Sequence, residues 1–279
     1  MPRMCAKLIA GTNEAEHRRW NDERWTAVWP KRERLTDAVT AFVLDAAALV
    51  SGEHVLDVGC GGGRASLAAA RAVGRGGAVV GADLSASLLA LADRRAREGG
   101  FENAAFCVVD MQTDMVAGRP FDVALSQFGV MFFDEPLTAF RNIRAHLRPG
   151  GRIAFVCWQG NEQNPWFFGS AITAFLPASP VLEPGKSPVG PFALADPGYT
   201  AALLRSAGFA DVHRTAHELV VEAAHDAVVD DVQFELMGIA TGDLAAAKAV
   251  AAEHLRQFAI GPELSRFPLA FQVFDAVNR

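Results

Sequence analysis

Long apolar runs are absent from this sequence. No stretch reaches the roughly 18 uninterrupted apolar residues that a membrane-spanning helix requires. The segment from Met1 to Gly11 carries scattered charges and lacks the apolar core of a secretory signal. We therefore expect a cytoplasmic protein without a membrane span.

Cysteine is scarce, and a surplus of basic charge is missing. The formal net charge is −6, whereas nucleic-acid binding depends on clustered lysine and arginine. We therefore expect a small-molecule partner and no nucleic acid, and the oligomeric state stays open, a homodimer included. The cysteines lie too far apart for a disulfide scaffold or a zinc site, so we expect reduced thiols and no metal. They are Cys5, Cys60, Cys107 and Cys157.

Short apolar runs alternate with segments of helical period from residue 54 onward. This alternation is typical of an α/β fold, a doubly wound Rossmann-like sheet with helices on both faces. The predicted strands are 54–58, 78–82, 105–109, 121–125 and 152–158, and the predicted helices between them are 64–73, 85–98 and 135–147.

The pattern breaks after residue 158. Residues 159–197 are rich in proline, glycine and aromatics, and they are too long for a plain connection, so we expect an insertion over the active face. The rest of the chain predicts a helix (198–206), a strand (212–221), a helical region (226–258) and a last strand (267–277), which we expect to be antiparallel and inserted in a seven-stranded sheet. The segment 13–50 predicts two helices.

These elements suggest one catalytic domain in three parts. Residues 1–50 are an N-terminal helical segment that belongs to the cap, and residues 51–158 are the Rossmann-like core. Residues 159–279 supply the cap insertion and complete the sheet.

A glycine-rich turn follows the first predicted strand. Val55 to Gly63 reads as an apolar strand that runs into closely spaced glycines and then a helix, so a ligand can approach the backbone closely there. A dinucleotide-binding fingerprint requires a third glycine at the position of Arg64, so the spacing departs from that fingerprint. Gly59, Cys60 through its backbone N–H, and Gly61 are the candidate contacts. Asp57 precedes the loop, and its carboxylate fits a structural role in the loop as well as a ligand contact.

Polar residues follow the next three strands, at the carboxyl edge where open sheets bind ligands. Asp83 ends the second strand, where its carboxylate can accept hydrogen bonds from ribose hydroxyls. Asp110 and Met111 follow the third, where they can receive an adenine amino group, although Asp110 also suits a helix N-cap. Ser126 and Gln127 end the fourth strand.

These residues carry a family resemblance. The run from Val55 to Trp166 resembles the class I S-adenosylmethionine-dependent methyltransferases of the small-molecule branch, similar to the quinone-biosynthesis and aklanonic-acid types. The resemblance implies that S-adenosylmethionine is the cofactor and S-adenosylhomocysteine the product. Its implied contacts are Asp57 and the Gly59–Gly61 backbone for the methionine part, Asp83 for the ribose, Leu84 and Met111 for the adenine faces, Asp110 for the adenine edge, and Ser126 beside the sulfonium. Gln127 and Arg64 depart from what relatives usually carry.

Methyl transfer from a sulfonium needs an oriented acceptor and no nucleophilic side chain, so we assign no catalytic residue. A histidine could serve as general base. His213 and His217 share one strand face, and His225 precedes the helical region, whereas His54 and His146 suit structural roles.

Aromatic residues indicate a pocket for a flat or apolar acceptor. The tryptophan spacing on the N-terminal helix also fits an ordinary packed face, which stays an alternative. Phe133 and Phe140 suit the core. The candidates are Trp20, Trp25, Trp29, Phe128, Phe132, Trp158, Trp166 and Phe167.

Two other functions share parts of this pattern. A nicotinamide-dependent oxidoreductase would share Asp83, but the chain has a single tyrosine, Tyr199, and no evident Tyr/Lys pair. A non-catalytic protein that binds S-adenosylmethionine would carry the same cofactor motifs.

Overall fold

A seven-stranded sheet forms the centre of the molecule, and its strand order is β3-β2-β1-β4-β5-β7-β6. The computed structural model describes residues 13–118, 120–177, 189–225 and 228–279. β7 pairs antiparallel with both β5 and β6, so the prediction of an inserted antiparallel last strand is confirmed. The strands are β1 (His54–Val58), β2 (Ala78–Asp83), β3 (Ala104–Val108), β4 (Phe121–Gln127), β5 (Leu147–Trp158), β6 (Ala210–Ala224) and β7 (Leu264–Val277).

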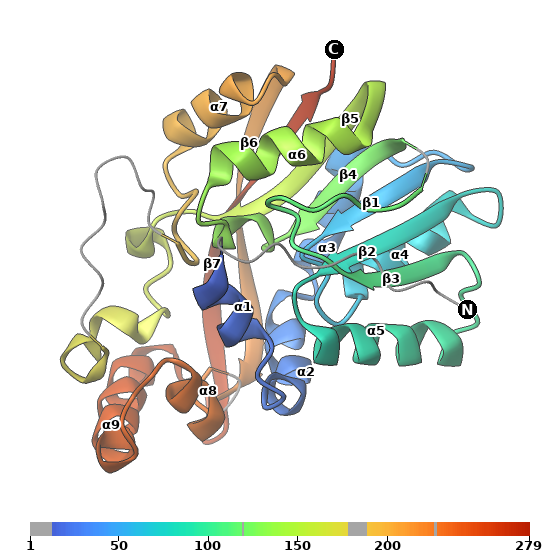
Figure 1. Ribbon diagram of the computed structural model, residues 1–279. Coiled ribbons are helices and arrows are strands. Elements are labelled where there is room, and N and C mark those ends of the chain that lie inside the picture. Colours follow the sequence, from blue (N-terminus) through green and yellow to red (C-terminus); the bar gives the residue numbers. More distant parts are fainter. Residues whose placement is uncertain (1–12, 119, 178–188, 226–227) are drawn as a thin grey trace.

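Helices cover both faces of the sheet (Figure 1). α3 (Val39–Ala47) and α4 (Arg64–Val73) pack together on one face, and α6 (Pro136–His146) and α7 (Pro197–Ser206) pack together on the other. α5 (Ala86–Glu98) lies against β3. The predicted doubly wound arrangement is therefore confirmed.

Local sequence explains where several of these helices begin. Ser85 accepts a hydrogen bond from the Leu88 N–H at 3.3 Å and so caps α5. The Asp196 carboxylate accepts one from the Tyr199 N–H at 2.7 Å, and Pro197 takes the first position of α7. These caps fix where the two helices begin. α5 packs against β3, which leads to a site residue, and α7 packs against β6, which completes the sheet.

The N-terminal segment contains three helices, so the prediction of two over 13–50 is wrong in number. They are α1 (Glu14–Trp20), α2 (Trp25–Thr36) and α3. The first break lies at Asn21 and Asp22, where the Asn21 amide donates to the His17 carbonyl and the Asp22 carboxylate accepts from the Arg24 N–H. These side chains compete for backbone groups that a continuous helix would use.

The turn before β5 also differs from prediction. β5 begins at Leu147 and not at Arg152, because Leu147 pairs with Phe121 of β4 and because Gly150 and Gly151 exchange hydrogen bonds with Asn278, just after β7. The Gly150 N–H donates to the Asn278 carbonyl at 2.6 Å. A register shift between Phe121 and Val123 accommodates the extra residues. The local sequence between the predicted helix (135–147) and the predicted strand (152–158) cannot show such a long-range pairing.

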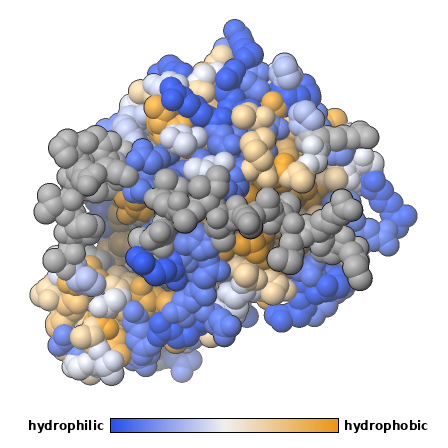
Figure 2. Space-filling view, viewed as in Figure 1, coloured by the Kyte–Doolittle hydropathy of each residue, from blue (hydrophilic) through white to orange (hydrophobic). Residues whose placement is uncertain are grey.

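The predicted helical region near residues 226–258 consists of two helices, α8 (Asp231–Leu236) and α9 (Leu244–Leu255), and residues 226–227 lie outside the described chain. Gly238, with φ +82°, lies between the helices. Hydrophobic colours gather over α9, at the lower left of Figure 2. Among the described residues, no helix has the length and apolar character needed to cross a membrane.

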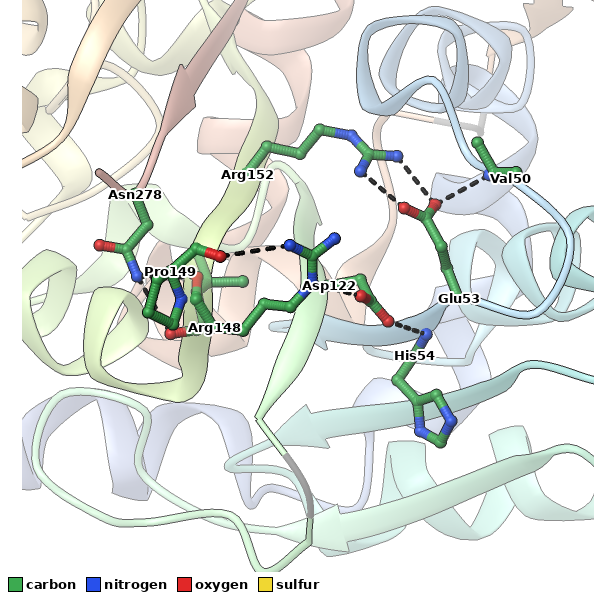
Figure 3. Close-up of polar contacts among 9 residues, drawn as sticks. Val50, Glu53, His54, Asp122, Arg148, Pro149, Arg152 and Asn278 are labelled. Atoms are coloured by element: carbon green, nitrogen blue, oxygen red, sulfur yellow. Dashed lines mark hydrogen bonds and ion pairs between the residues drawn. The ribbon is translucent and has the colours of Figure 1, made fainter.

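The amino ends of the parallel strands are joined by a polar network, shown in Figure 3. Asp122 accepts hydrogen bonds from the His54 N–H at 2.8 Å and from Arg148 Nε at 2.6 Å. Arg152 donates to both carboxylate oxygens of Glu53, at 2.7 and 2.8 Å. These contacts tie β1, β4 and β5 together at the edge opposite the glycine-rich loop.

Candidate functional site

A cavity of about 430 Å³ lies at the carboxyl ends of β1, β2 and β4. Its other wall is formed by α1, α2 and α8, which we call the helical cover; α2 contacts both α5 and α8 (Figure 1). Small-molecule sites typically measure about 300–1,000 Å³. The volume therefore suits a small-molecule ligand.

The glycine-rich loop forms one end of this cavity. A Cβ on Gly59, where φ is +67°, would lie 2.7 Å from Gly129 Cα, and a Cβ on Gly61 would lie 2.4 Å from the Trp29 ring. Glycine is required because the loop is clamped between the turn after β4 and α2. Gly59 lines the cavity, whereas Gly61 does not.

Cys60 lines the cavity, but its N–H donates to the Ala82 carbonyl at 3.1 Å. The expectation that this N–H faces a ligand is therefore wrong. Cys60 and Cys157 are free thiols, while Cys5 lies outside the described residues. The described part of the chain holds no cluster of three or more histidine, cysteine or acidic side chains suited to a metal ion.

Asp57 is fully buried and lines the cavity. Its Oδ2 accepts a hydrogen bond from the Ser66 hydroxyl, while Oδ1 has no partner among the described residues. Burial, and secondarily the negative charge of Asp83, raises the pKa of Asp57 to about 7, although the Ser66 hydrogen bond opposes the shift. Asp57 thus serves the loop and still has an oxygen to offer to a cationic group.

Asp83 holds the loop and also faces the cavity. Its Oδ2 accepts from the Gly61 N–H at 2.7 Å, and its Oδ1 accepts from the Ser85 N–H at 2.8 Å. Burial raises the pKa of Asp83, and these backbone donors oppose the rise. Each carboxylate oxygen keeps a second lone pair. Leu84 lines the cavity beside it.

Asp110 and Met111 line the cavity beyond β3, and both are buried. Asp110 Oδ1 accepts from the Gln112 N–H at 2.9 Å, so the local turn uses one of its oxygens. Burial raises the pKa of Asp110, and hydrogen bonds from Gln112 and Asn13 oppose the rise. The expected helix N-cap is wrong, because residues 111–113 form a turn and no helix begins at Asp110; the contact with this turn and a ligand contact are compatible.

Ser126 does not line the cavity. Its hydroxyl donates to the Val58 carbonyl at 2.6 Å and accepts from the Gly129 N–H at 3.2 Å, which fixes the turn after β4. Gln127, by contrast, does line the cavity, and its side chain is held by the Thr40 hydroxyl at 2.8 Å and the Thr36 carbonyl at 3.0 Å. Of the two residues that end the fourth strand, Gln127 and not Ser126 therefore faces the cavity.

Comparison with known proteins agrees with this geometry. A family model described as "Methyltransferase domain" matches residues 49–166. The chain is 35% identical over 113 residues to aklanonic acid methyltransferase DauC of Streptomyces sp. strain C5, covering 40% of this chain and 51% of that protein. It is 29% identical over 181 residues to nocamycin O-methyltransferase of Saccharothrix syringae, covering 62% and 64%. The matches thus span about half to two thirds of these curated relatives.

Residues 49–166 form a class I methyltransferase domain. The family resemblance that the glycine-rich loop and the strand ends indicated is therefore confirmed. S-adenosylmethionine is the cofactor of this class. The solved structure of the [4+2]-cyclase SpnF has a TM-score of 0.59 at 19% identity and covers 98% of both chains. That likeness shows the fold alone.

The cavity of the methyltransferase domain fits the cofactor in two respects. The unpartnered Asp57 Oδ1 is a buried acceptor, as a methionine ammonium requires. The carboxylate of Asp83 keeps lone pairs for ribose hydroxyls. Both groups lie along one wall of the cavity, which also includes Asp110 and Met111.

None of the histidines in the described ranges lines this cavity. His213 lies 3.5 Å from Asp275, and the ring of His217 packs 4.6 Å from that of Phe42. The other candidates form hydrogen bonds elsewhere: His225 with Ser265, His146 with the Val116 N–H, and His54 through its own N–H with Asp122. The prediction of a histidine general base therefore gains no support from the domain's geometry.

The predicted aromatic residues do gather at the cavity. Trp20 stacks on Trp25 with ring centroids 4.7 Å apart, and Phe128 stacks on Trp158 at 4.1 Å. Phe140 is fully buried, while Phe133 is buried and also reaches the cavity. The cavity-lining members are Trp20, Trp25, Trp29, Phe128, Phe132, Trp158, Trp166 and Phe167.

The charged residues of the helical cover were not predicted from the sequence. Arg19 on α1 and Arg32 on α2 line the cavity, as does Glu33, which pairs with Arg95 at 2.7 Å. Arg32 lies seven residues after Trp25 and three after Trp29, so the helical spacing that places the two tryptophans on one face also places Arg32 on that face.

Proposed function

We propose that this chain transfers the methyl group of S-adenosylmethionine to an oxygen, nitrogen or carbon atom of a small, largely apolar or aromatic acceptor. The main support for this proposal is that the Asp57 and Asp83 carboxylates and a wall of aromatic rings line the same cavity. The names of the relatives, aklanonic acid methyltransferase and nocamycin O-methyltransferase, support a small-molecule acceptor.

The proposed roles follow from the contacts of each residue. Asp57 Oδ1 accepts from the methionine ammonium, Asp83 accepts from the ribose, and Asp110 and Met111 meet the adenine. Cys60 and Gly59 shape the loop, and Gly61 positions Asp83 through its N–H. Ser126 acts through the turn that it fixes, so its proposed role is to position Gln127.

Chemistry at the methyl group depends on position and on exclusion of water. The bound cofactor supplies a methyl group already activated on a sulfonium. The stacked rings of Phe128 and Trp158 exclude water from the acceptor and present aromatic faces that attract a cation. With no described histidine at the cavity, we propose that the acceptor atom is already nucleophilic or loses its proton to water.

Calorimetric titration tests this proposal. We expect S-adenosylmethionine and S-adenosylhomocysteine to bind and NADH not to bind. Binding of NADH alone would make Asp83 an oxidoreductase residue and contradict the proposal. Transfer of radiolabelled methyl to a panel of phenols, quinones and polyketides then separates an enzyme from a non-catalytic cofactor-binding protein, for which no acceptor would be labelled.

A further inference from the structure

Two guanidinium groups face the cavity from the helical cover. Arg19 Cζ lies 5.5 Å from the Trp20 ring centroid and 5.8 Å from that of Phe132. Arg32 Cζ lies 5.4 Å from the Trp25 centroid. Both arginines are half-buried, and both line the cavity beside these rings.

Their charges are poorly compensated within the described residues. Arg32 has no hydrogen bond or ion pair there, and its contact is the Trp25 ring. Arg19 reaches Glu16 only at 3.7 Å, while Glu16 already accepts from Trp20 Nε1 at 2.8 Å. Arg19 Nε is buried and lacks a partner in the same part of the chain. Burial, followed by the neighbouring Arg19 charge, lowers the pKa of Arg32 to about 10.

None of the acidic residues that line the cavity pairs with Arg19 or Arg32 in the described part of the chain, and Asp57, whose Oδ1 is unpartnered, lies in β1 at the sheet edge. Asp83 and Asp110 accept backbone hydrogen bonds at the strand ends, and Glu33 pairs with Arg95. Trp29 and Glu33, not Arg32, lie against the glycine-rich loop. The cavity therefore has carboxylates along the sheet edge and two cations on the aromatic side of the cover.

We propose that Arg19 and Arg32 bind an anionic group, a carboxylate or a phosphate, on the aromatic acceptor. This inference rests on the proposed function and narrows its acceptor to an aromatic or polycyclic anion. A planar guanidinium donates two parallel hydrogen bonds to such a group, and a desolvated cation that lacks a partner gains most from it. The anion anchors the acceptor while another of its atoms receives the methyl group.

The cofactor also carries a carboxylate, so the test must separate the two anions. Benzoate, cinnamate and naphthoate would each be titrated beside the matching carboxamide, with and without saturating S-adenosylhomocysteine. Phenyl phosphate beside phenol distinguishes a phosphate from a carboxylate. We expect at least one anion to bind about tenfold or more tightly than its neutral partner, as charge-assisted hydrogen bonds require.

Variants assign that preference to the arginines. Arg32→Gln and Arg19→Gln should each reduce the anion preference by about tenfold, with the affinity for S-adenosylhomocysteine and for the amides unchanged. Arg34→Gln and Arg18→Gln remove exposed arginines of the same two helices and should leave the preference intact. Thermal melting checks that all four variants are folded.

Three results would overturn the inference. The first is that no acid and no phosphate exceeds its neutral partner, failure of every probe to bind included. The second is an unchanged preference in both cavity variants. The third is a loss confined to S-adenosylhomocysteine, which would assign the arginines to the cofactor. Failure of the parent protein to bind S-adenosylhomocysteine would contradict the proposed function itself, and the titrations without that nucleotide would still read the anion preference.

Discussion

Polar side chains at the two edges of the parallel part of the sheet differ in whether they have hydrogen-bond partners. At the amino edge, Arg152, Glu53, Asp122 and Arg148 have partners in the protein, at 2.6 to 2.8 Å (Figure 3). At the carboxyl edge and on the helical cover that faces it, Asp57 Oδ1, Arg19 Nε and Trp29 Nε1 are buried, and the described residues offer them no partner.

The difference separates stability from function. A buried polar atom without a partner costs about 1–3 kcal/mol, so several at one cavity are tolerated only where something else compensates. The paired hydrogen bonds at the amino edge can supply the stability that offsets this cost. Substitutions there should therefore act on folding, and substitutions at the cavity should act on ligands.

The largest effect is expected from Arg152→Met. Arg152 also donates to the Ala47 and Ala48 carbonyls, at 2.6 and 2.8 Å, and its side chain is 23% exposed. Removing one partner of a mostly buried pair should lower the free energy of unfolding by about 2–3 kcal/mol. Urea denaturation measures it, and calorimetry should find the affinity for S-adenosylhomocysteine unchanged.

Arg148→Met is the matched control. Arg148 is 46% exposed in its pair with Asp122, so its loss should cost under about 1 kcal/mol. Equal losses of unfolding free energy in the two variants, or a loss of cofactor affinity in Arg152→Met, would contradict the assignment of stability to the amino edge and ligand binding to the cavity.

Asp83→Asn tests the carboxyl edge. The amide can accept from only one of the two backbone donors at Gly61 and Ser85, and it loses the negative charge offered to the ribose. Cofactor affinity should fall by about 1.5–3 kcal/mol, roughly tenfold to a hundredfold. Calorimetry measures this fall, and an unchanged dissociation constant would remove Asp83 from the proposed ribose site.

Asp57 gives the smallest effect, and it depends on pH. The folded-state pKa of about 7 exceeds the unfolded 3.8, so its contribution to stability is complete below pH 4 and is lost as pH rises through 7. A cofactor ammonium requires the ionised carboxylate, so the affinity for S-adenosylhomocysteine should rise about tenfold from pH 6 to pH 8.

Asp57→Asn should flatten that profile, whereas Asp93→Asn, an exposed carboxylate on α5, should retain it. Titration in two buffers of different ionisation enthalpy should show proton release on binding to the parent protein near pH 7. The same proton release in Asp57→Asn would exclude this carboxylate as the source of the released proton.

Much of the sheet edge could be predicted because its signals are local. Buried parallel strands appear as continuous apolar runs, and their carboxyl ends meet at one edge, so the amino-acid order alone groups Asp57, Asp83 and Asp110. The role of Ser126 could not be predicted, because it depends on a hydrogen bond to the Val58 carbonyl of the neighbouring strand.

The helical cover was less predictable, since its position depends on docking. Helical period places Arg32 on the face of Trp25 and Trp29, but nothing local to Arg19 indicates that it shares their cavity, because α1 also carries an exposed arginine, Arg18. Likewise, the break at Asn21 depends on side-chain bonds to the backbone that helical period does not report.

The position of β7 has a consequence for how the chain is made. β7 lies between β5 and β6, although it follows both in sequence. On the ribosome, β6 therefore emerges with no place in the sheet, and it must wait until residues 264–277 have been synthesised. β6 and β7 can then dock on β5 as an antiparallel pair, so β5 (Leu147–Trp158) presents an unpaired strand edge throughout that interval, when a chaperone or a neighbouring chain has its best access.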